Sequence, residues 1–319
     1  MKVRKVLFLK PANSTFIEHD EAILREHFDV RTIDFTKKTH IGAMTTLLRG
    51  TIWADVTVAW FADIYALWAS RLSRALRKKC VVIFGGYETA NLEWLGYGLL
   101  TTEKGTRMVK EIALTSHVLA VSDTVCNEVR SLAPHSYRSV IPLGIAPALP
   151  PVEKENIVLT VGQVTIDRMM LKGIDKFAKV ASHMRDTETR FIAIGEIGDS
   201  VRSFTKATTS VEFLGQLPHA EVLSWMNRSK VFCQLSVRES FGVSVAEAMA
   251  HGCVPVVTGV GNLPALVGDT GFIVPFGDIP TTVDAIESAL LISGEPARDR
   301  MLGYSLARRE ANLVREVYR

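Results

Sequence analysis

The stretch Arg238-Glu-Ser-Phe-Gly-Val-Ser-Val-Ala-Glu-Ala-Met-Ala-His-Gly-Cys-Val-Pro-Val-Val257 decides how the second half of this chain folds. An apolar run ends at Val237, and Phe241-Gly242 separates it from a short helix that the pattern predicts over Val243 to Ala250. Val254 to Val257 then form a second apolar run, typical of a buried strand. The stretch therefore predicts a strand, a helix and another strand joined by short connections.

One acid, Glu247, interrupts the otherwise apolar predicted helix, and a second, Glu239, lies in the turn before it. Burying a carboxylate is costly unless a donor pairs with it, so Glu247 needs either a protein partner or a ligand. The amides and the positive dipole end at a helix start bind anions such as phosphate. Acids beside a phosphate site suit the hydroxyls of a ribose or a hexose. The alternative is a packed strand–helix–strand unit with two surface acids.

The length and composition favour a two-domain soluble protein. A chain of 319 residues exceeds what one hydrophobic core usually organises. The 47% hydrophobic and 22% charged residues are ordinary for globular proteins, and the net charge of +3 is too small to favour nucleic acid as a partner. No apolar run approaches the ~20 residues of a membrane span. The four cysteines form no Cys-x-x-Cys pair, so we expect reduced thiols and a cytoplasmic location.

Short apolar runs alternate with helical patterns along the whole chain, and the alternation starts again after a proline cluster at Pro147, Pro150 and Pro151. Strands that alternate with helices predict a parallel sheet with helices on both faces. We therefore predict an α/β protein of two Rossmann-like domains, residues 1–150 and 151–319, which face each other across a cleft. The last predicted helix, 304–319, either stays with the second domain or packs back on the first. The predicted strands are 6–9, 30–33, 56–60, 81–84, 118–121 and 140–142, then 157–161, 191–194, 211–214, 231–235, 254–257 and 272–274.

A second polar stretch, Thr160-Val-Gly-Gln-Val-Thr-Ile-Asp-Arg-Met-Met-Leu-Lys-Gly173, follows the first strand of the second half. We interpret it as a loop that carries Arg168 and Lys172 to a helix beginning near Ile174. A lysine at the carboxyl end of a strand can neutralise a diphosphate. The stretch matches neither the Gly-x-x-x-x-Gly-Lys-Ser/Thr loop nor Gly-x-Gly-x-x-Gly. The alternative for Lys172 is a solvated side chain.

Together, the two stretches resemble the retaining glycosyltransferases of family 4, whose members have the GT-B fold. The resemblance rests on the E-x7-E pattern from Glu239 to Glu247, on Lys172-Gly-Ile-Asp175 and on Gly271-Phe-Ile-Val-Pro275. It extends over most of the chain, through Phe213-Leu-Gly215 and weaker matches in the first half, but only the second half is highly specific.

The resemblance implies a role for each matching residue. Glu239 would contact hydroxyls of the donor sugar, and Lys172 would stabilise the departing diphosphate, so these two are the catalytic candidates. Glu247 would hold the ribose of a nucleotide. The family needs no metal and no cofactor beyond the nucleotide diphosphate sugar, and the sequence has no Asp-x-Asp pattern. The substrate-binding candidates are Gln163, Arg168, Ser240, Phe241, Gly242, Val243 and Glu247.

The chain departs from the family pattern at two places. Gln163 stands where members usually carry an arginine that joins the lysine on the phosphates, and Arg168 is the candidate replacement. Ala265 replaces the glutamate of a Pro-Glu pair, a change that leaves the Glu239–Lys172 pair in place. The family's mechanism demands no dedicated base, because the leaving phosphate can take the acceptor's proton. His40 and Glu88 are further candidates in the first half.

The expected function is therefore transfer of a hexosyl group from a nucleotide diphosphate sugar to an acceptor hydroxyl of a glycan or a lipid-linked glycan. An epimerase or a phosphorylase on the same fold is one alternative. A nucleotide-sugar binding protein with weak or lost turnover is another, favoured by Gln163 and Ala265. Arg71, Arg74 and Lys78 share one face of a predicted helix: either a solvated surface or a patch for anionic lipid at the inner face of a membrane.

Overall fold

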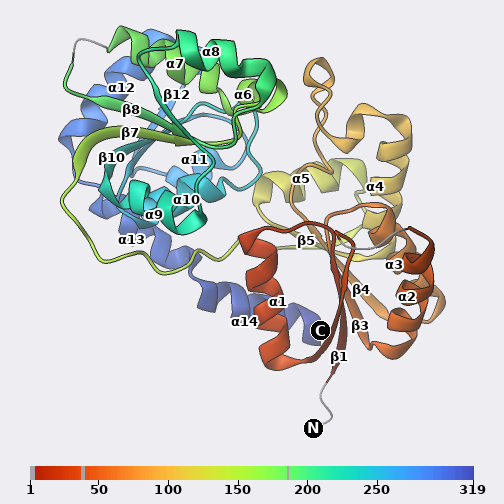
Figure 1. The fold of residues 1–319 in the computed structure, drawn as a ribbon. Helices are drawn as coiled ribbons and strands as arrows, with labels where there is room; N and C mark the ends of the chain where they lie inside the picture. Colours follow the sequence, from red (N-terminus) through yellow and green to blue (C-terminus); the bar gives the residue numbers. More distant parts are fainter. Residues whose placement is uncertain (1–3, 37–39, 185–186) are drawn as a thin grey trace. The chain divides into compact units, whose positions relative to one another are not determined.

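The computed structural model describes residues 4–36, 40–184 and 187–319 (Figure 1). The chain divides into two compact units, one made of the residues up to Gly144 together with Leu306–Arg319, and the other of Ile145–Ser305. Each unit contains a six-stranded parallel sheet flanked by helices, which confirms the predicted α/β architecture. Among the described residues, none of the helices combines the length and the apolar character that a membrane span requires.

The first unit has the strand order β2-β1-β3-β4-β5-β6. Its central strands are buried along almost their whole length, which explains why they read as continuous apolar runs. Figure 1 shows α1 and α14 on one side of this sheet and α2 and α3 on the other. The elements are β1 (Lys5–Lys10), α1 (Thr15–His27), β2 (Asp29–Asp34), α2 (His40–Trp53), β3 (Val56–Trp60), α3 (Ile64–Ala75), β4 (Lys79–Phe84), α4 (Glu103–Thr115), β5 (His117–Ala120), α5 (Asp123–Leu132), β6 (Tyr137–Val140) and α14 (Leu306–Tyr318), with short 3-10 turns at Glu93–Leu95 and Leu99–Thr101.

A buried ion pair anchors α14 in the first unit. Arg309 donates through Nε to Oδ1 of Asp20 at 3.0 Å and through Nη2 to Oδ2 at 2.7 Å, and the two side chains are only 1% and 2% exposed. The third nitrogen, Nη1, donates to the Ile141 carbonyl at 2.6 Å, and Trp60 Nε1 donates to Asp20 Oδ2 at 3.0 Å. Gly144 allows this close packing, because a Cβ there would lie 2.8 Å from the Leu306 side chain.

The second unit has the strand order β12-β11-β10-β7-β8-β9. The chain proceeds from β7 towards one edge of the sheet and later returns to place β10 on the other side of β7, so β7 and β10 flank a topological switch point. The elements are β7 (Glu155–Val161), α6 (Ile166–Lys172), α7 (Ile174–His183), β8 (Arg190–Ile194), α8 (Arg202–Ala207), β9 (Glu212–Gly215), α9 (His219–Arg228), β10 (Ser229–Gln234), α10 (Val243–Ala250), β11 (Val254–Thr258), α11 (Leu263–Val267), β12 (Phe272–Val274), α12 (Ile279–Leu291) and α13 (Glu295–Met301), with 3-10 turns at Asp199–Val201 and Leu302–Tyr304.

The predicted loop before Lys172 is wrong, because residues 166–172 form the helix α6. Its seven residues include two methionines, a leucine, an arginine and a lysine, which are all good helix formers. Gly173 ends α6 in a left-handed conformation with φ of 70° and separates it from α7. This glycine is therefore the C-cap of one helix and the N-cap of the next, and it does not belong to a loop.

The predicted row of cations on one helix is also wrong. Helix α3 ends at Ala75, and Arg77 takes a φ of 54°, so Lys78 lies beyond the helix. The Lys78 ammonium donates to the carbonyls of Thr51, Ile52 and Ala54 at the end of α2, with N···O distances from 2.5 to 3.1 Å. Such a cation satisfies the last carbonyls of a helix. Arg71 meanwhile pairs with Glu111 at 2.6 Å, so two of the three cations have partners within the unit.

Candidate functional site

The two predicted catalytic residues meet at the carboxyl ends of β7 and β10. Lys172 is the last residue of α6, which follows β7, and Glu239 lies in the loop that follows β10. The Lys172 ammonium donates to Glu239 Oε1, and the hydroxyl of Ser236 donates to the same oxygen at 3.3 Å. The side chains of Lys172 and Glu239 are 28% and 12% exposed. Residues 67 positions apart therefore form one ion pair at the switch point of the sheet.

The end of α6 is fixed against the loop after β10. Val237 donates its amide to the Leu171 carbonyl at 2.9 Å. A Cβ on Gly173 would overlap the carbonyl oxygen of Leu235, so only glycine permits this approach. Buried Gln234 donates to the Ser236 hydroxyl at 2.7 Å. These contacts hold the backbone on either side of the ion pair, so the Lys172 ammonium is positioned before any ligand arrives.

The turn after β11 supports the loop from its other side. Asn262 donates through its backbone N–H to the Glu239 carbonyl at 3.1 Å. Its side-chain amide donates to the Phe241 carbonyl, also at 3.1 Å. Thr258 donates through its hydroxyl to the Ser236 carbonyl at 2.6 Å. Gly261 has a φ of 56°, and a Cβ on it would overlap the carbonyl oxygen of Glu239. Sequence reasoning missed Asn262; the Gly-Asn pair at 261–262, a few residues after the predicted strand 254–257, is the signal that could have indicated it.

Helix α10 begins at this loop with unsatisfied amides. Gly242 is its N-cap, with φ of 92° and ψ of 51°, and the first intrahelical hydrogen bond joins the Ala246 amide to the Gly242 carbonyl. The amides of Val243, Ser244 and Val245 therefore precede the helical hydrogen bonds, and amides in this position are able to bind an anion. Phe241 is buried and contacts the Tyr304 ring, with 5.9 Å between centroids, so its side chain belongs to the core. A ligand would meet Phe241 through its backbone. Ser240 and Val243 are both half-buried.

The acid in the apolar helix α10, Glu247, has a partner within the protein, the side chain of His219. His219, the first residue of α9, lies with Nε2 2.9 Å from Glu247 Oε1. The hydrogen bond to this carboxylate raises the pKa of His219. The Glu247 side chain is 16% exposed, and His219 is 42% exposed. Sequence reasoning missed His219, because a separation of 28 positions gives no local signal. The contact of Glu247 with a ribose stays a prediction.

The remaining predicted substrate-binding residues lie around the end of β7. Gln163 is exposed and donates to Glu196 Oε2 at 3.2 Å, so it contacts the residues after the neighbouring strand β8. Arg168 lies on α6 one turn before Lys172 and is half-buried. Residues four apart in a helix share a face, so Arg168 and Lys172 lie on the same side of α6. This placement is compatible with Arg168 as the replacement for the missing arginine, which stays a prediction.

Buried His251 and the further candidate Glu88 both have hydrogen-bond partners within the chain. His251 is buried; its Nδ1 donates to the Glu247 carbonyl at 2.7 Å, its Nε2 accepts from the Leu149 amide at 3.2 Å, and burial lowers its pKa. Glu88 is buried in the first unit and accepts from the amides of Gly85, Gly86 and Ala62, and its burial raises its pKa. The side chain of His40 lies outside what the structure describes.

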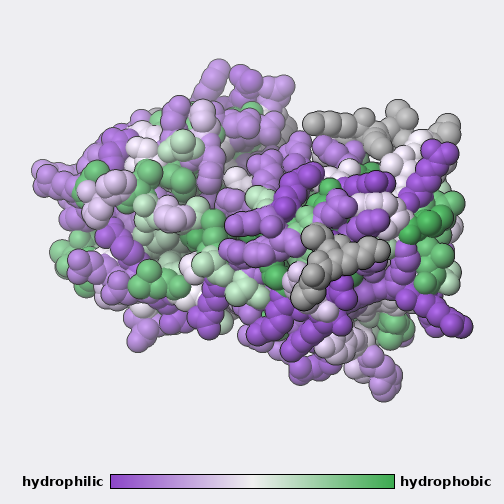
Figure 2. Space-filling view, turned by 90° about the horizontal axis from the view of Figure 1, so that it is seen from below, coloured by the Kyte–Doolittle hydropathy of each residue, from purple (hydrophilic) through white to green (hydrophobic). Residues whose placement is uncertain are grey.

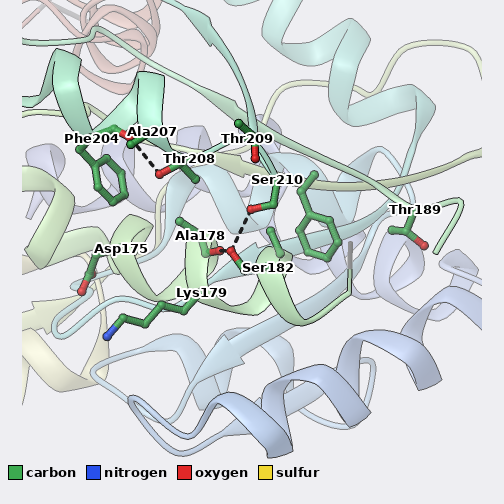
Figure 3. A pocket seen from close by; sticks show the side chains of 12 residues that line it. Asp175, Ala178, Lys179, Ser182, Thr189, Phe204, Ala207, Thr208, Thr209 and Ser210 are labelled. Atoms are coloured by element: carbon green, nitrogen blue, oxygen red, sulfur yellow. Dashed lines mark hydrogen bonds between the residues drawn. The ribbon is translucent and has the colours of Figure 1, made fainter. Parts of the chain in front are cut away.

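A separate cavity of about 460 Å³ lies between α7 and α8 (Figure 3). Ser182 and Ser210 meet across it, with 3.0 Å between their hydroxyl oxygens. Thr189 and Ser210 precede β8 and β9, so the cavity opens near the amino ends of these strands. Ligands of doubly wound sheets bind at the carboxyl ends, where Lys172 and Glu239 lie. We therefore do not assign this cavity to the same site.

The described residues bring together one group of side chains that could share a metal ion, Glu26, His27 and Glu310. It lies on α1 and α14 of the first unit, where His27 Nε2 is 2.7 Å from Glu310 Oε1. This group is not part of the Lys172–Glu239 site, which belongs to the second unit.

Comparison with known proteins identifies the second unit. Residues 155–291 match the family model described as glycosyl transferases group 1, so this segment is a glycosyltransferase group 1 domain. The chain is 34% identical over 82 residues to a subunit of phosphatidylinositol N-acetylglucosaminyltransferase from Arabidopsis thaliana, which is 26% of this chain and 18% of that protein. It is 36% identical over 106 residues to D-inositol 3-phosphate glycosyltransferase of Corynebacterium diphtheriae, which is 33% of this chain and 24% of that protein. The chain thus spans less than a quarter of the length of these relatives.

The fold also resembles that of solved structures over nearly the whole chain. The crystal structure of Anabaena HepE, in complex with UDP and glucose, superposes with a TM-score of 0.78 at 14% identity and covers 99% of both chains. The structural similarity confirms the predicted GT-B fold.

Proposed function

We propose that the protein is a retaining hexosyltransferase that uses a nucleotide diphosphate sugar as donor and an acceptor hydroxyl on a glycan or a lipid-linked glycan. The observation that carries this proposal is the Lys172–Glu239 ion pair at the switch point of the second sheet, beside the start of α10. The group 1 domain and the names of the sequence relatives support sugar transfer. The UDP and glucose bound to Anabaena HepE support a nucleotide donor for a protein of this fold.

The arrangement suits a displacement in which the diphosphate leaves. The α10 amides and the Lys172 ammonium would bind the phosphates, and Glu239 would accept hydrogen bonds from the sugar hydroxyls. As the bond between the anomeric carbon and the phosphate oxygen breaks, negative charge grows on that oxygen beside Lys172. Charge that is already positioned stabilises this developing anion without reorganisation. The acceptor oxygen then bonds to the same face of the anomeric carbon, and its proton passes to the leaving phosphate.

The relatives suggest which acceptors to test first. The names of two of them include an inositol, as a phosphatidylinositol in one and as an inositol phosphate in the other. A test panel therefore combines inositol phosphates, phosphatidylinositol in detergent and simple glycosides. We propose a cytoplasmic location, in keeping with four buried cysteines that form no disulfide.

Calorimetric titration with UDP-, GDP- and ADP-sugars tests the donor site. We expect one of these donors to bind the wild-type chain, and nucleotide release to follow when a suitable acceptor is added. If none of the donors binds, the proposal is wrong. Binding followed by donor rearrangement without an acceptor would indicate an epimerase, and sugar-1-phosphate formation from a glycan and phosphate would indicate a phosphorylase. Tight binding with no transfer to any acceptor would indicate a binding protein.

The His219–Glu247 contact predicts a pH dependence of donor binding. Because the pKa of His219 is raised by its hydrogen bond to Glu247, lowering the pH towards 6 protonates the His219 ring. A carboxylate bound to a cation is a weaker acceptor for ribose hydroxyls, so the donor KM should rise as the pH falls. A partly exposed pair of this kind is worth about 0.2–1 kcal/mol, which corresponds to a rise of at most about fivefold. In His219→Asn the KM should be flat over the same range. An unchanged pH profile in the variant would contradict the assignment.

A further inference from the structure

The first unit carries an apolar stripe on the outer face of α2. Met44, Leu48 and Ile52 are exposed, by 39%, 42% and 56%. They are spaced four residues apart and therefore lie on one face of the helix. Exposed aliphatic side chains that occur singly are ordinary, but three in one row on a helix are a candidate interaction surface.

Helix α3 and the residue that caps its end carry a second apolar stripe with the same spacing. Ile64, Trp68 and Leu76 are exposed, and Leu72 between them is half-buried. Figure 1 shows α2 and α3 on the same side of the sheet, and the two helices pack against each other. In Figure 2, hydrophobic side chains gather at the edge of the first unit where these helices lie, next to hydrophilic ones. We call this surface, made of the two stripes, the α2–α3 face.

The charges around the α2–α3 face are mostly positive. Neither helix contains an aspartate or a glutamate, whereas Arg49, Arg71, Arg74 and the following Arg77 are all exposed. Glu111 of α4 pairs with Arg71 at the border of the face. The Arg71 guanidinium also lies 5.3 Å from the centre of the Trp68 ring, so the aromatic side chain borders the cations. An apolar band beside arginines, on helices without acids, is the composition of helices that lie in a membrane interface.

We propose that the α2–α3 face binds the surface of a membrane that contains anionic lipid. The arginines would contact lipid phosphates, and the two apolar stripes, including Trp68 at the level of the headgroups, would enter the interface. The charges of Arg71, Arg74 and Lys78 do not suffice to bind anionic lipid, because the Lys78 ammonium is hydrogen-bonded to carbonyls at the end of α2. The apolar stripes therefore supply binding that the cations alone do not. The inference does not depend on sugar transfer.

Co-sedimentation of the full chain with vesicles tests this inference directly. We expect binding to equimolar phosphatidylcholine and phosphatidylglycerol vesicles, and much weaker binding to phosphatidylcholine alone. Leu48→Glu together with Ile52→Glu should lower the apparent affinity by at least about tenfold, because two apolar side chains become charged. Leu291→Glu is the matched control: Leu291 is 87% exposed on α12 of the second unit, and its replacement should leave binding unchanged.

A second measurement keeps the test valid if the double variant folds poorly. Brominated lipids quench tryptophans that enter the interface, so quenching of the wild-type chain should fall in Trp68→Phe. Failure of the wild type to bind anionic vesicles would overturn the inference, as would unchanged quenching in Trp68→Phe. A wild-type dimer that Leu48→Glu separates would also overturn it, since a second copy of the chain would then cover this face. Donor titrations without lipid decide the proposed function separately.

Discussion

Replacing Lys172 by alanine should lower turnover by about 100- to 1,000-fold, the usual effect of removing one positioned group that stabilises a developing anion. The loss should appear mainly in kcat, because the charge on the leaving oxygen is largest in the transition state. Glu239→Gln should also lose turnover by a similar factor, since its carboxylate binds Lys172 in the structure and would bind the sugar hydroxyls. The turnover of both variants is measured as nucleotide release at saturating concentrations of donor and acceptor.

Two controls separate chemistry from folding. Lys179 lies on α7, the helix directly after Lys172, and is exposed, so Lys179→Ala should keep wild-type turnover. Lys172→Arg keeps a cation next to Glu239 and should recover part of the activity that Lys172→Ala loses. Thermal melts then show whether each variant is folded. Wild-type turnover in a folded Lys172→Ala protein would refute the assignment of the ion pair as the centre of the site.

The largest expected effect on stability concerns Arg309. Truncating one partner of a buried ion pair leaves an uncompensated charge and costs about 3–5 kcal/mol, so Arg309→Ala should destabilise the first unit by roughly that amount. The substitution also leaves the Ile141 carbonyl without its donor. Urea denaturation followed by tryptophan fluorescence reports on this unit, because Trp53, Trp60, Trp68 and Trp94 belong to it and only Trp225 belongs to the other.

The matched control for Arg309→Ala is Arg315→Ala on the same helix. Arg315 is exposed and contacts Asn312, so its loss should change the free energy of unfolding by less than about 0.5 kcal/mol. Combining Arg309→Met with Asp20→Asn removes both charges while the amide oxygen can still accept from Trp60, so the double variant should recover part of the loss. Equal effects of Arg309→Ala and Arg315→Ala would contradict the role given to the buried pair.

Much of the second unit follows from local patterns. Strands such as β11, whose residues are all buried, appear in the sequence as continuous apolar runs. The 20-residue stretch 238–257 predicts the strand–helix–strand order around α10. The family resemblance also assigns Lys172 and Glu239 to one site. The structure explains how they meet, because β7 and β10 lie side by side at the switch point of the sheet. The ion pair itself is seen only in the structure.

Other features depend on tertiary contacts that no local pattern contains. His219 is the partner of Glu247 because α9 packs against α10, and Lys78 is the cap of α2 because the turn after α3 ends beside it. The helix α6 was not predicted for a different reason. A glycine such as Gly173 suggests a loop, although between two short helices it can end one and begin the next. Helix boundaries at glycine are therefore where sequence reasoning is weakest.

The position of α14 has a consequence for how the chain is made. The first unit is discontinuous, since it needs residues 306–319 in addition to those before 145. On the ribosome, residues 145–305 are synthesised in full before Arg309 emerges, so Asp20 is without its guanidinium throughout that time. Synthesis of the first unit therefore starts before that of the second unit and is completed after it. During synthesis, the second unit can acquire its native contacts while the first unit still lacks α14, and a nascent chain released before residue 306 would have only one completed unit.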